Sequence, residues 1–537
     1  MAKLAPAYRP RRPQDTVLHR VVRAHLETFI EHARQTYDKP LPKYVRDELR
    51  GYLRCGLFDY GFTRARCEAC KHDVLIAFSC KARGLCPSCA GRRMCNTAAH
   101  IVDRIIPSVP VRQWVLSLPF DVRARAAYDA RFLTEIIRTF ARALGDRHRT
   151  WARSIALDES EFAAITFVQR FGSSLNLNVH LHVVVVDGVF SRDGDDVAFT
   201  AASPPTHAEM MAIVGKVRAR VEKLTAQSAD DLQPPLRACV RVALSPGDIR
   251  AVSVELQADE PETTQPDAHD GSAVEEAHYN LEAGVRIAAD DDFGREHLLR
   301  YCARPPLSLA RLTQLPHGKI GYRIKKLRNH RSKLRIMTPL ELLARLAALI
   351  PPPRHPLVRF HGAFAPRSSW RKLVVPKPPA PTIKSTHHHD DANERSPQKP
   401  PTPSRAPPSP TPPPSPTSRQ SPPRTSSHPA SAPALIAQTE WLTPNVLSIR
   451  HWERIRAGAL IATSARIDWP TLMSRTFDVD VLECPKCTGR LRVLALIDDA
   501  DTAAKILDEL DIAPTPPPTR ARDPATLDHD PDATDPC

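Results

Sequence analysis

The stretch that decides the fold is Asn178-Val-His180-Leu-His182-Val-Val-Val-Val186, where two histidines interrupt an otherwise apolar run. Its length and its β-branched residues predict a buried strand. Residues two apart in a strand point to the same face of the sheet, so His180 and His182 lie side by side. Imidazole is a common metal ligand. The pair therefore predicts either a site for one metal ion or two hydrogen-bonded core histidines, and the stretch alone leaves both open.

Strand and helix patterns alternate around this stretch. The apolar runs of strand length cover residues 111–118, 163–169 and 177–186, and apolar residues at helical spacing cover 132–144 and 210–224. Thr338-Pro-Leu-Glu341 is a capping box with Pro at the first helical position, and it opens a predicted helix over residues 340–350. Strands interleaved with long helices predict an α+β sandwich with helices packed on one sheet.

The composition bounds the class of protein. The chain has 537 residues, with 75 Lys and Arg against 60 Asp and Glu, a formal charge of +15 that favours a polyanionic partner. No apolar run approaches the ~20 residues that span a membrane, and the first residues lack the apolar core of a signal peptide. We expect a cytoplasmic protein without a membrane partner. Its 12 cysteines should then be mostly reduced, and clustered ones should bind metal.

Composition also divides the chain into four parts. These are a basic, Cys-rich domain at 1–105, a mixed α and β domain at 106–375, a Pro- and Ser-rich segment at 376–434 and a C-terminal segment at 435–537. The third part holds the main concentration of the 54 prolines, and such a composition cannot bury a core. It is therefore predicted to be a disordered linker. The last part ends in an acidic, Pro-rich tail that is also predicted to be disordered.

Six cysteines cluster in the first domain. They are the pairs Cys67-Glu-Ala-Cys70 and Cys86-Pro-Ser-Cys89, together with Cys80 and Cys95. Two Cys-X-X-Cys pairs at this spacing predict that the four paired cysteines bind one structural Zn²⁺ in a tetrahedral, closed and non-catalytic site. The two other cysteines are either spare or replace a paired one, with Cys80 as the alternative ligand. The surrounding arginines and lysines fit either a nucleic-acid contact or a solvated basic face.

A third pair, Cys484-Pro-Lys-Cys487, lies far downstream. One pair supplies only two of the four ligands that a structural zinc site needs. The pair therefore either borrows ligands from elsewhere in the chain or is the vestige of a larger element. The sequence leaves both readings open.

A tyrosine stands near the end of a predicted helix. Arg295-Glu-His-Leu-Leu-Arg-Tyr301-Cys-Ala-Arg304 reads as a helix that stops at two prolines. The flanking Arg300 and Arg304 would favour a tyrosinate at Tyr301. An isolated tyrosine is more often a packed aromatic than a nucleophile, so this helix alone does not establish chemistry.

A strip of cations without acidic residues follows this helix, over Pro316–Met337. A strip this dense suits contacts with phosphates, and partial alternation within Gly318–Arg335 predicts a hairpin. The predicted nucleic-acid contacts are Arg300, Arg304, Lys319, Arg323, Lys325, Lys326, Arg328 and Arg331.

Taken in order, these motifs resemble the rolling-circle insertion-sequence transposases, whose nuclease is of the His-hydrophobe-His (HUH) class. The resemblance rests on the cysteine pairs, on Thr166–His182, on Arg300–Pro306 and on Leu357–Pro366. It covers about residues 65–371, with a fainter echo at 441–497, and leaves out the Pro-rich segment. It implies an N-terminal transposase zinc-binding domain followed by an HUH-type antiparallel sheet with packed helices.

The resemblance also implies a mechanism. His180 and His182 would hold Mg²⁺ or Mn²⁺, which polarises a phosphate oxygen, and the hydroxyl of Tyr301 would attack the phosphorus of single-stranded DNA. The products would be a 5′-phosphotyrosine and a free 3′-OH, and the covalent bond would later be used to join target DNA. The third metal ligand is expected to be Gln169, on the neighbouring predicted strand, because its carbonyl suits a hard cation. His297, one helical turn before Tyr301, is the rival.

The chain departs from part of this family, which carries two tyrosines one helical turn apart. Here the flanking positions are His297 and Pro305. The chain therefore resembles the single-tyrosine branch, in which Tyr301 acts twice or two chains cooperate as a homo-oligomer. The alternatives are a non-catalytic zinc-dependent DNA-binding protein, as a decayed or domesticated copy, and a replication-initiator-type relaxase. The presence of His180, His182 and Tyr301 favours the transposase.

Overall fold

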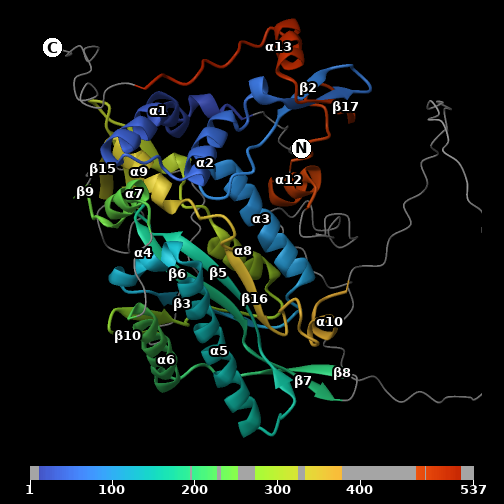
Figure 1. The fold of residues 1–537 in the computed structure, drawn as a ribbon. Helices are drawn as coiled ribbons and strands as arrows, with labels where there is room; N and C mark the ends of the chain where they lie inside the picture. Colours follow the sequence, from blue (N-terminus) through green and yellow to red (C-terminus); the bar gives the residue numbers. More distant parts are fainter. Residues whose placement is uncertain are drawn as a thin grey trace, which may run out of the picture. The chain divides into compact units, whose positions relative to one another are not determined.

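The computed structural model describes residues 11–193, 196–226, 232–251, 273–324, 333–377, 467–477 and 479–521 (Figure 1). The predicted Pro-rich linker lies outside the described residues beyond residue 377, and so does the predicted acidic tail from residue 522. Every described residue belongs to one folding unit, which includes parts from both ends of the chain.

The stretch with the two histidines forms β6 (Leu177–Val186), in the middle of a seven-stranded sheet. Its neighbours are β3 (Val111–Ser117) and β5 (Ala163–Phe171), and both pair with it in the antiparallel sense. The three strands predicted from the apolar runs are confirmed to within two residues. Continuous burial on both sides explains why these strands read as apolar runs with little alternation.

Shorter strands complete this sheet on both sides. β16 (Val358–Gly362) pairs with β5, whereas β11 (Tyr279–Glu282) and β12 (Arg286–Ile287) both pair with β3. β10 (Ala273–Glu276) pairs with β11 and forms the far edge. All of these pairings are antiparallel, so the predicted antiparallel sheet is confirmed.

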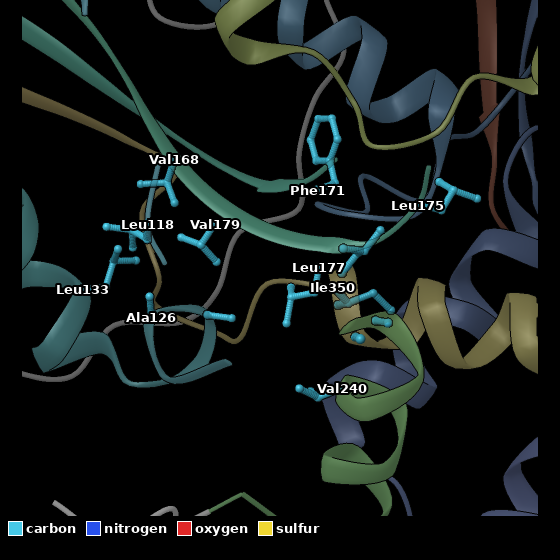
Figure 2. Close-up of a cluster of buried hydrophobic side chains, with 14 of the residues drawn as sticks. Leu118, Ala126, Leu133, Val168, Phe171, Leu175, Leu177, Val179, Val240 and Ile350 are labelled. Atoms are coloured by element: carbon cyan, nitrogen blue, oxygen red, sulfur yellow. The ribbon is translucent and has the colours of Figure 1, made fainter. Parts of the chain in front are cut away.

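The two faces of β6 belong to different hydrophobic cores. Leu181 and Val183 point into a large core that includes α4 (Phe120–Tyr128) and α5 (Ala130–Ser154), part of which is drawn in Figure 2. Val184, on the face of the two histidines, points into a second core with α3 (Pro87–Arg104) and α8 (Asp292–Ala303). The helices thus cover both faces of the sheet.

The remaining elements surround this sheet. The other helices are α1 (Val17–Tyr37), α2 (Lys43–Arg54), α6 (His207–Thr225), α7 (Pro234–Leu244), α9 (Pro339–Leu349), α10 (Arg371–Val374), α12 (Trp469–Phe477) and α13 (Ala500–Glu509), with 3₁₀ turns η1 (Pro13–Asp15), η2 (Phe58–Tyr60) and η3 (Leu309–Arg311). Three smaller sheets hold β13 (Leu312–Gln314), β14 (Ile320–Ile324), β15 (Lys333–Met337) and β9 (Asp248–Ala251); β4 (Ser160–Glu161), β7 (Gly188–Asp193) and β8 (Asp196–Ala201); and β17 (Leu491–Ile497), β1 (Phe62–Cys67) and β2 (Asp73–Ala77).

The predicted helices form where the local signals placed them. The apolar residues at helical spacing lie in α5 and α6, and the Thr338 side chain accepts a hydrogen bond from the Glu341 amide at the start of α9. The helix with Tyr301 ends at Ala303, before the two prolines. The α+β class is therefore confirmed. Among the described residues, no helix has both the length and the apolar character to cross a membrane.

The C-terminal segment shares a sheet with the N-terminal domain. β17 pairs antiparallel with β1, so that Cys67 lies opposite Leu491 and Phe62 opposite Ile497. In Figure 1 the red β17 lies in the same sheet as the blue β2. The change in composition at residue 435 therefore does not mark the edge of a separately folded part.

Candidate active site and cysteine clusters

The histidine pair lies on the face of the central sheet that α3 and α8 cover. His180 stands directly opposite Gln169 of β5 and opposite Ser117 of β3. The rings of His180 and His182 are 4.9 Å apart between centroids. Directly opposed residues of an antiparallel pair share one face. The structure thus brings Gln169, the predicted third metal ligand, next to both histidines.

Both imidazoles are buried in the neutral form that binds metal. The Nδ1 of His180 lies 3.0 Å from the carbonyl oxygen of Asn178, which can only accept, so Nδ1 carries the proton and Nε2 keeps its lone pair. Burial lowers the pKa of His180 to about 4 and lowers the pKa of His182 well below its usual value. A lone pair on a buried, unprotonated ring is what a metal ion requires.

Gln169 leaves one side-chain oxygen without a partner. Its Nε2 donates to the backbone carbonyl oxygens of Tyr301 at 2.9 Å and Cys302 at 3.0 Å, which fixes which end of the amide is nitrogen. Its Oε1 is buried with no hydrogen-bond partner. An unpaired buried acceptor is costly, and an amide oxygen suits a hard cation. Gln169 thus ties β5 to the tyrosine helix and offers an oxygen ligand.

Gln113 of β3 is a site residue that we did not predict. One end of its amide lies 2.7 Å from the Nδ1 of His182, and the same atom lies 3.5 Å from the Sγ of Cys302. An amide oxygen at that position would accept from Nδ1–H, and the Nε2 of His182 would then offer its lone pair to a metal. That Nε2 is buried without a partner. In the orientation that the structure has, this amide atom of Gln113 is Nε2 and donates to the Sγ of Cys302, and burial raises the pKa of that thiol to about 12, so it stays protonated.

Tyr301 lies against the histidine pair. Its ring is 5.5 Å from that of His182, edge to face, and the guanidinium carbon of Arg304 lies 4.5 Å from the centre of the Tyr301 ring. Burial raises the pKa of Tyr301, and the positive charge of Arg304 opposes this rise without cancelling it. Arg304 thus favours the tyrosinate, as expected, but desolvation of the phenolate outweighs it and the net pKa is raised.

Arg300 faces away from this site. Its side chain is buried and forms an ion pair with Glu296, which also accepts from Arg475 of α12. Arg475 is in turn paired with Asp103 of α3. In this structure Glu296 neutralises the charge of Arg300 within the core between α3, α8 and α12, and the predicted DNA contact of Arg300 stays a prediction.

His297, the rival third ligand, lies away from the histidine pair. It is half-buried, and its ring stacks on that of Phe293 with centroids 6.4 Å apart. Among the described residues, the only groups of three or more His, Cys, Asp or Glu with ligand atoms within 4.8 Å of one another are two cysteine clusters. In this structure His297 therefore does not form a close group of ligand atoms with His180 and His182.

The cation strip forms the predicted hairpin in part. β14 pairs antiparallel with β15. Lys319 is exposed before β14, whereas Arg323 donates to the backbone carbonyl of Ala310. The other predicted contacts, Lys325, Lys326, Arg328 and Arg331, lie outside the described residues.

A cavity of about 90 Å³ adjoins Gln169. Four arginines line it: Arg83 and Arg93 come from the cysteine-rich domain, and Arg170 and Arg304 from the domain of the central sheet. The guanidinium groups of Arg83 and Arg93 also donate to backbone carbonyl oxygens, and these hydrogen bonds hold both side chains in place. The positive lining places cationic side chains next to the predicted metal ligands.

The first cysteine cluster consists of Cys55, Cys80, Cys86 and Cys89. The Sγ of Cys55 lies 3.5 Å from that of Cys86 and 3.6 Å from that of Cys89. Four thiolates around Zn²⁺ at 2.3 Å would be about 3.8 Å apart, whereas a disulfide needs about 2.0 Å. The cluster fits a structural zinc. Cys55 was missed because it has no partner nearby in the sequence; it caps the end of α2.

The second cluster consists of Cys67, Cys70, Cys484 and Cys487. Our prediction that the pairs Cys67/Cys70 and Cys86/Cys89 share one zinc is therefore wrong. The β1–β2 hairpin carries the first pair away from the start of α3, where the second pair lies. Cys80, the alternative ligand, belongs to the first cluster. Cys95 is buried in a separate small core with Ile467 and with Leu472 of α12.

Two known protein families match the chain, one over the cysteine-rich domain and one over most of the domain with the central sheet. The family described as "Transposase zinc-binding domain", of the IS91 type, matches residues 21–118, and the family described as "Putative transposase" matches residues 163–372. The first match contains the whole of the first cysteine cluster, and the second contains Gln169, His180, His182 and Tyr301. No curated protein and no solved structure matches the chain.

A DNA-processing enzyme with a zinc-binding domain is the class that these matches and the cysteine clusters define. More particularly, the two matched domains indicate that the chain is a transposase.

Proposed function

We propose that this transposase is a single-tyrosine enzyme of the HUH class, which cleaves and joins single-stranded DNA at the ends of an insertion element. The observation that carries the proposal is the contact of Tyr301 with His182, beside a Gln169 amide that binds the backbone of Tyr301 and Cys302. A nucleophile, two neutral imidazoles and an unpaired amide oxygen meet at one place. A structural core of this kind has no need of an unpaired buried oxygen.

The residues present fit a divalent cation. His180 and His182 offer ring nitrogens and Gln169 offers an oxygen, and the orphaned Oε1 and Nε2 atoms are buried there. Imidazole ligands alone suit Zn²⁺ equally, and the preference for Mg²⁺ or Mn²⁺ rests on the resemblance. When bound, the ion would polarise a non-bridging oxygen of the scissile phosphate.

Tyr301 performs the covalent step. Its Oη attacks the phosphorus, an O–P bond to the tyrosine forms, and the bond from phosphorus to the 3′ oxygen breaks. The 3′ oxygen leaves with the electron pair and takes up a proton, and the tyrosine proton is lost to solvent. Because burial raises the pKa of Tyr301, Arg304 assists by stabilising the phenolate as it forms.

The test of the function is a covalent adduct. The full-length protein, mixed with single-stranded DNA that carries the element's end and with Mg²⁺ or Mn²⁺, should give a protein–DNA species that survives denaturation. A chain that binds this DNA but never forms the adduct would instead be the non-catalytic zinc-dependent DNA-binding protein.

The histidine pair should be required for metal binding. His180→Ala combined with His182→Ala should abolish Mn²⁺ binding and lower adduct formation by roughly a thousandfold, since polarisation of the phosphate contributes several kcal/mol. Calorimetric Mn²⁺ titration and adduct gels measure the two effects. His317→Ala, at an exposed turn residue, should change neither. Gln169→Met, tested in the same titration, should weaken Mn²⁺ binding; unchanged binding would remove Gln169 from the ligand set.

Arg304 should set the pH dependence of cleavage. Its charge lowers the pKa of Tyr301, so Arg304→Gln should raise that pKa and leave less phenolate at any pH below it. Single-turnover cleavage at neutral pH should fall at least roughly tenfold, and the pH above which the rate levels off should move to more alkaline values. An arginine that only binds DNA would lower the rate equally at every pH, and such a result would contradict the assigned role.

A further inference from the structure

The two cysteine pairs of the second cluster have the same backbone conformation. In each, the fourth residue after the first cysteine has a left-handed backbone, with φ of 60° at Lys71 and 59° at Thr488. The amides of these residues donate to the carbonyl oxygens of Cys67 and Cys484, both at 3.0 Å. Two segments that are far apart in the sequence thus form matching turns, each presenting two thiols to the same point.

The next residue closes each turn in the same way. The Cys67 amide donates to the carbonyl oxygen of His72 at 2.9 Å, and the Cys484 amide donates to that of Gly489 at 2.7 Å. Such tight loops direct both cysteine side chains of a pair toward one metal ion. In addition, the Lys486 amide lies 3.4 Å from the Sγ of Cys484, as a donor to that sulfur.

The four sulfurs have the spacing of a metal site. The Sγ atoms of Cys67 and Cys487 are 3.4 Å apart, and those of Cys70 and Cys484 are 3.7 Å apart. These distances lie near the edge of about 3.8 Å expected for four thiolates around Zn²⁺, and well above the length of a disulfide. Each short distance joins one N-terminal cysteine to one C-terminal cysteine, so neither pair is complete without the other.

The surrounding packing fits this arrangement of the two turns. A Cβ at position 489 would lie 3.1 Å from the Sγ of Cys67 and 3.4 Å from that of Cys487, so glycine permits the close approach of the two turns. Pairing of β1 with β17 places Cys67 opposite Leu491, and both pack with Cys484 in one small apolar core. The strand pairing thus brings the two turns together.

We propose that Cys67, Cys70, Cys484 and Cys487 bind a second structural Zn²⁺, separate from the one in the first cluster and shared between the two ends of the chain. The matched zinc-binding domain ends at residue 118 and contains only two of these ligands. Four thiolates in a tetrahedron suit Zn²⁺, and the thiols release their protons on binding.

The second zinc site closes the chain on itself. Cross-linking two points so far apart in sequence removes much of the freedom of the unfolded chain, as a disulfide across a long loop does. The segment that it retains includes α12, whose Arg475 pairs with Asp103 and with Glu296 of the tyrosine helix. Zinc at this site would therefore help to keep α12 against the helix that carries Tyr301.

Zinc stoichiometry of the purified full-length protein tests this inference. With both clusters occupied, the wild type should contain at least two zinc ions per chain, and Cys484→Ser combined with Cys487→Ser should contain one fewer than the wild type. Cys239→Ala, a buried cysteine outside both clusters, should keep both ions. One ion in the wild type, or no loss of zinc in the double variant, would overturn the proposal.

A conservative variant keeps the test decisive if the double variant does not fold. Cys487 is exposed, so Cys487→His should retain a fourth ligand and both metal ions. After replacement of zinc by Co²⁺, the wild type should show the spectrum of two tetrathiolate sites. Cys487→His should show a partial loss of sulfur-to-cobalt charge-transfer intensity with unchanged stoichiometry. A Cys487→His spectrum identical to that of the wild type would mean that Cys487 binds no metal.

Discussion

Replacing Tyr301 with phenylalanine should abolish the covalent protein–DNA adduct, a loss of at least about a thousandfold that corresponds to more than about 4 kcal/mol of transition-state stabilisation. The change removes only the hydroxyl. The ring should remain packed against His182 and beneath Arg304. The fold and DNA binding should therefore survive while the chemistry stops. Denaturing gels with end-labelled single-stranded DNA measure the adduct, and gel shifts without metal measure binding.

Tyr60→Phe is the matched control, because Tyr60 is largely exposed and far from the site in sequence. It should form the adduct at the wild-type level. An adduct that persists in the Tyr301→Phe protein would assign the nucleophile to another residue and would remove the central element of the proposed function.

The second large effect concerns stability. Arg475→Ala should lower the free energy of unfolding by about 3–5 kcal/mol, because it leaves Asp103 and Glu296 buried without their shared cation. The Arg475 side chain is 0% exposed, and it lies 2.9 Å from a carboxylate oxygen of Asp103 and 3.2 Å from one of Glu296. Glu296 also pairs with Arg300, the residue before Tyr301, so adduct formation should fall as well.

Chemical denaturation of the two proteins measures this difference. Arg34→Ala offers the comparison, since Arg34 forms an ion pair with Glu31 at the surface, where its side chain is 59% exposed. Loss of such a surface pair should cost less than about 1 kcal/mol. Equal effects of the two substitutions would show that the buried network does not stabilise the junction of α3, α8 and α12.

Several elements of the candidate site could be predicted because they depend on neighbours in the sequence. The alternation of a strand places His180 and His182 on one face whatever the rest of the chain does. The sequence also places Gln169 on the neighbouring predicted strand, and the pairing of β5 with β6 brings it opposite His180. The prolines after Arg304 end the tyrosine helix for the same local reason.

The partners of charged and polar side chains could not be predicted in this way. Arg300 was predicted to contact DNA because it lies beside Tyr301 and near other arginines in the sequence. In the structure it pairs with Glu296, and Asp103 pairs with the nearby Arg475. Gln113 lies in a strand that reads as apolar, and nothing local marks it as the partner of His182. Burial likewise decides the pKa of Tyr301, and burial depends on helices from other parts of the chain.

The sequence by itself determined the α+β class, the paired histidines on a central strand, the helix that ends after Tyr301 and the presence of cysteine pairs suited to zinc. Only the tertiary structure decided which cysteines meet. Spacing favours the nearest pairs, but β1 pairs with β17 and carries Cys67 and Cys70 to Cys484 and Cys487. Ligation depends on distance in space, and strand pairing between the two ends of the chain sets that distance here.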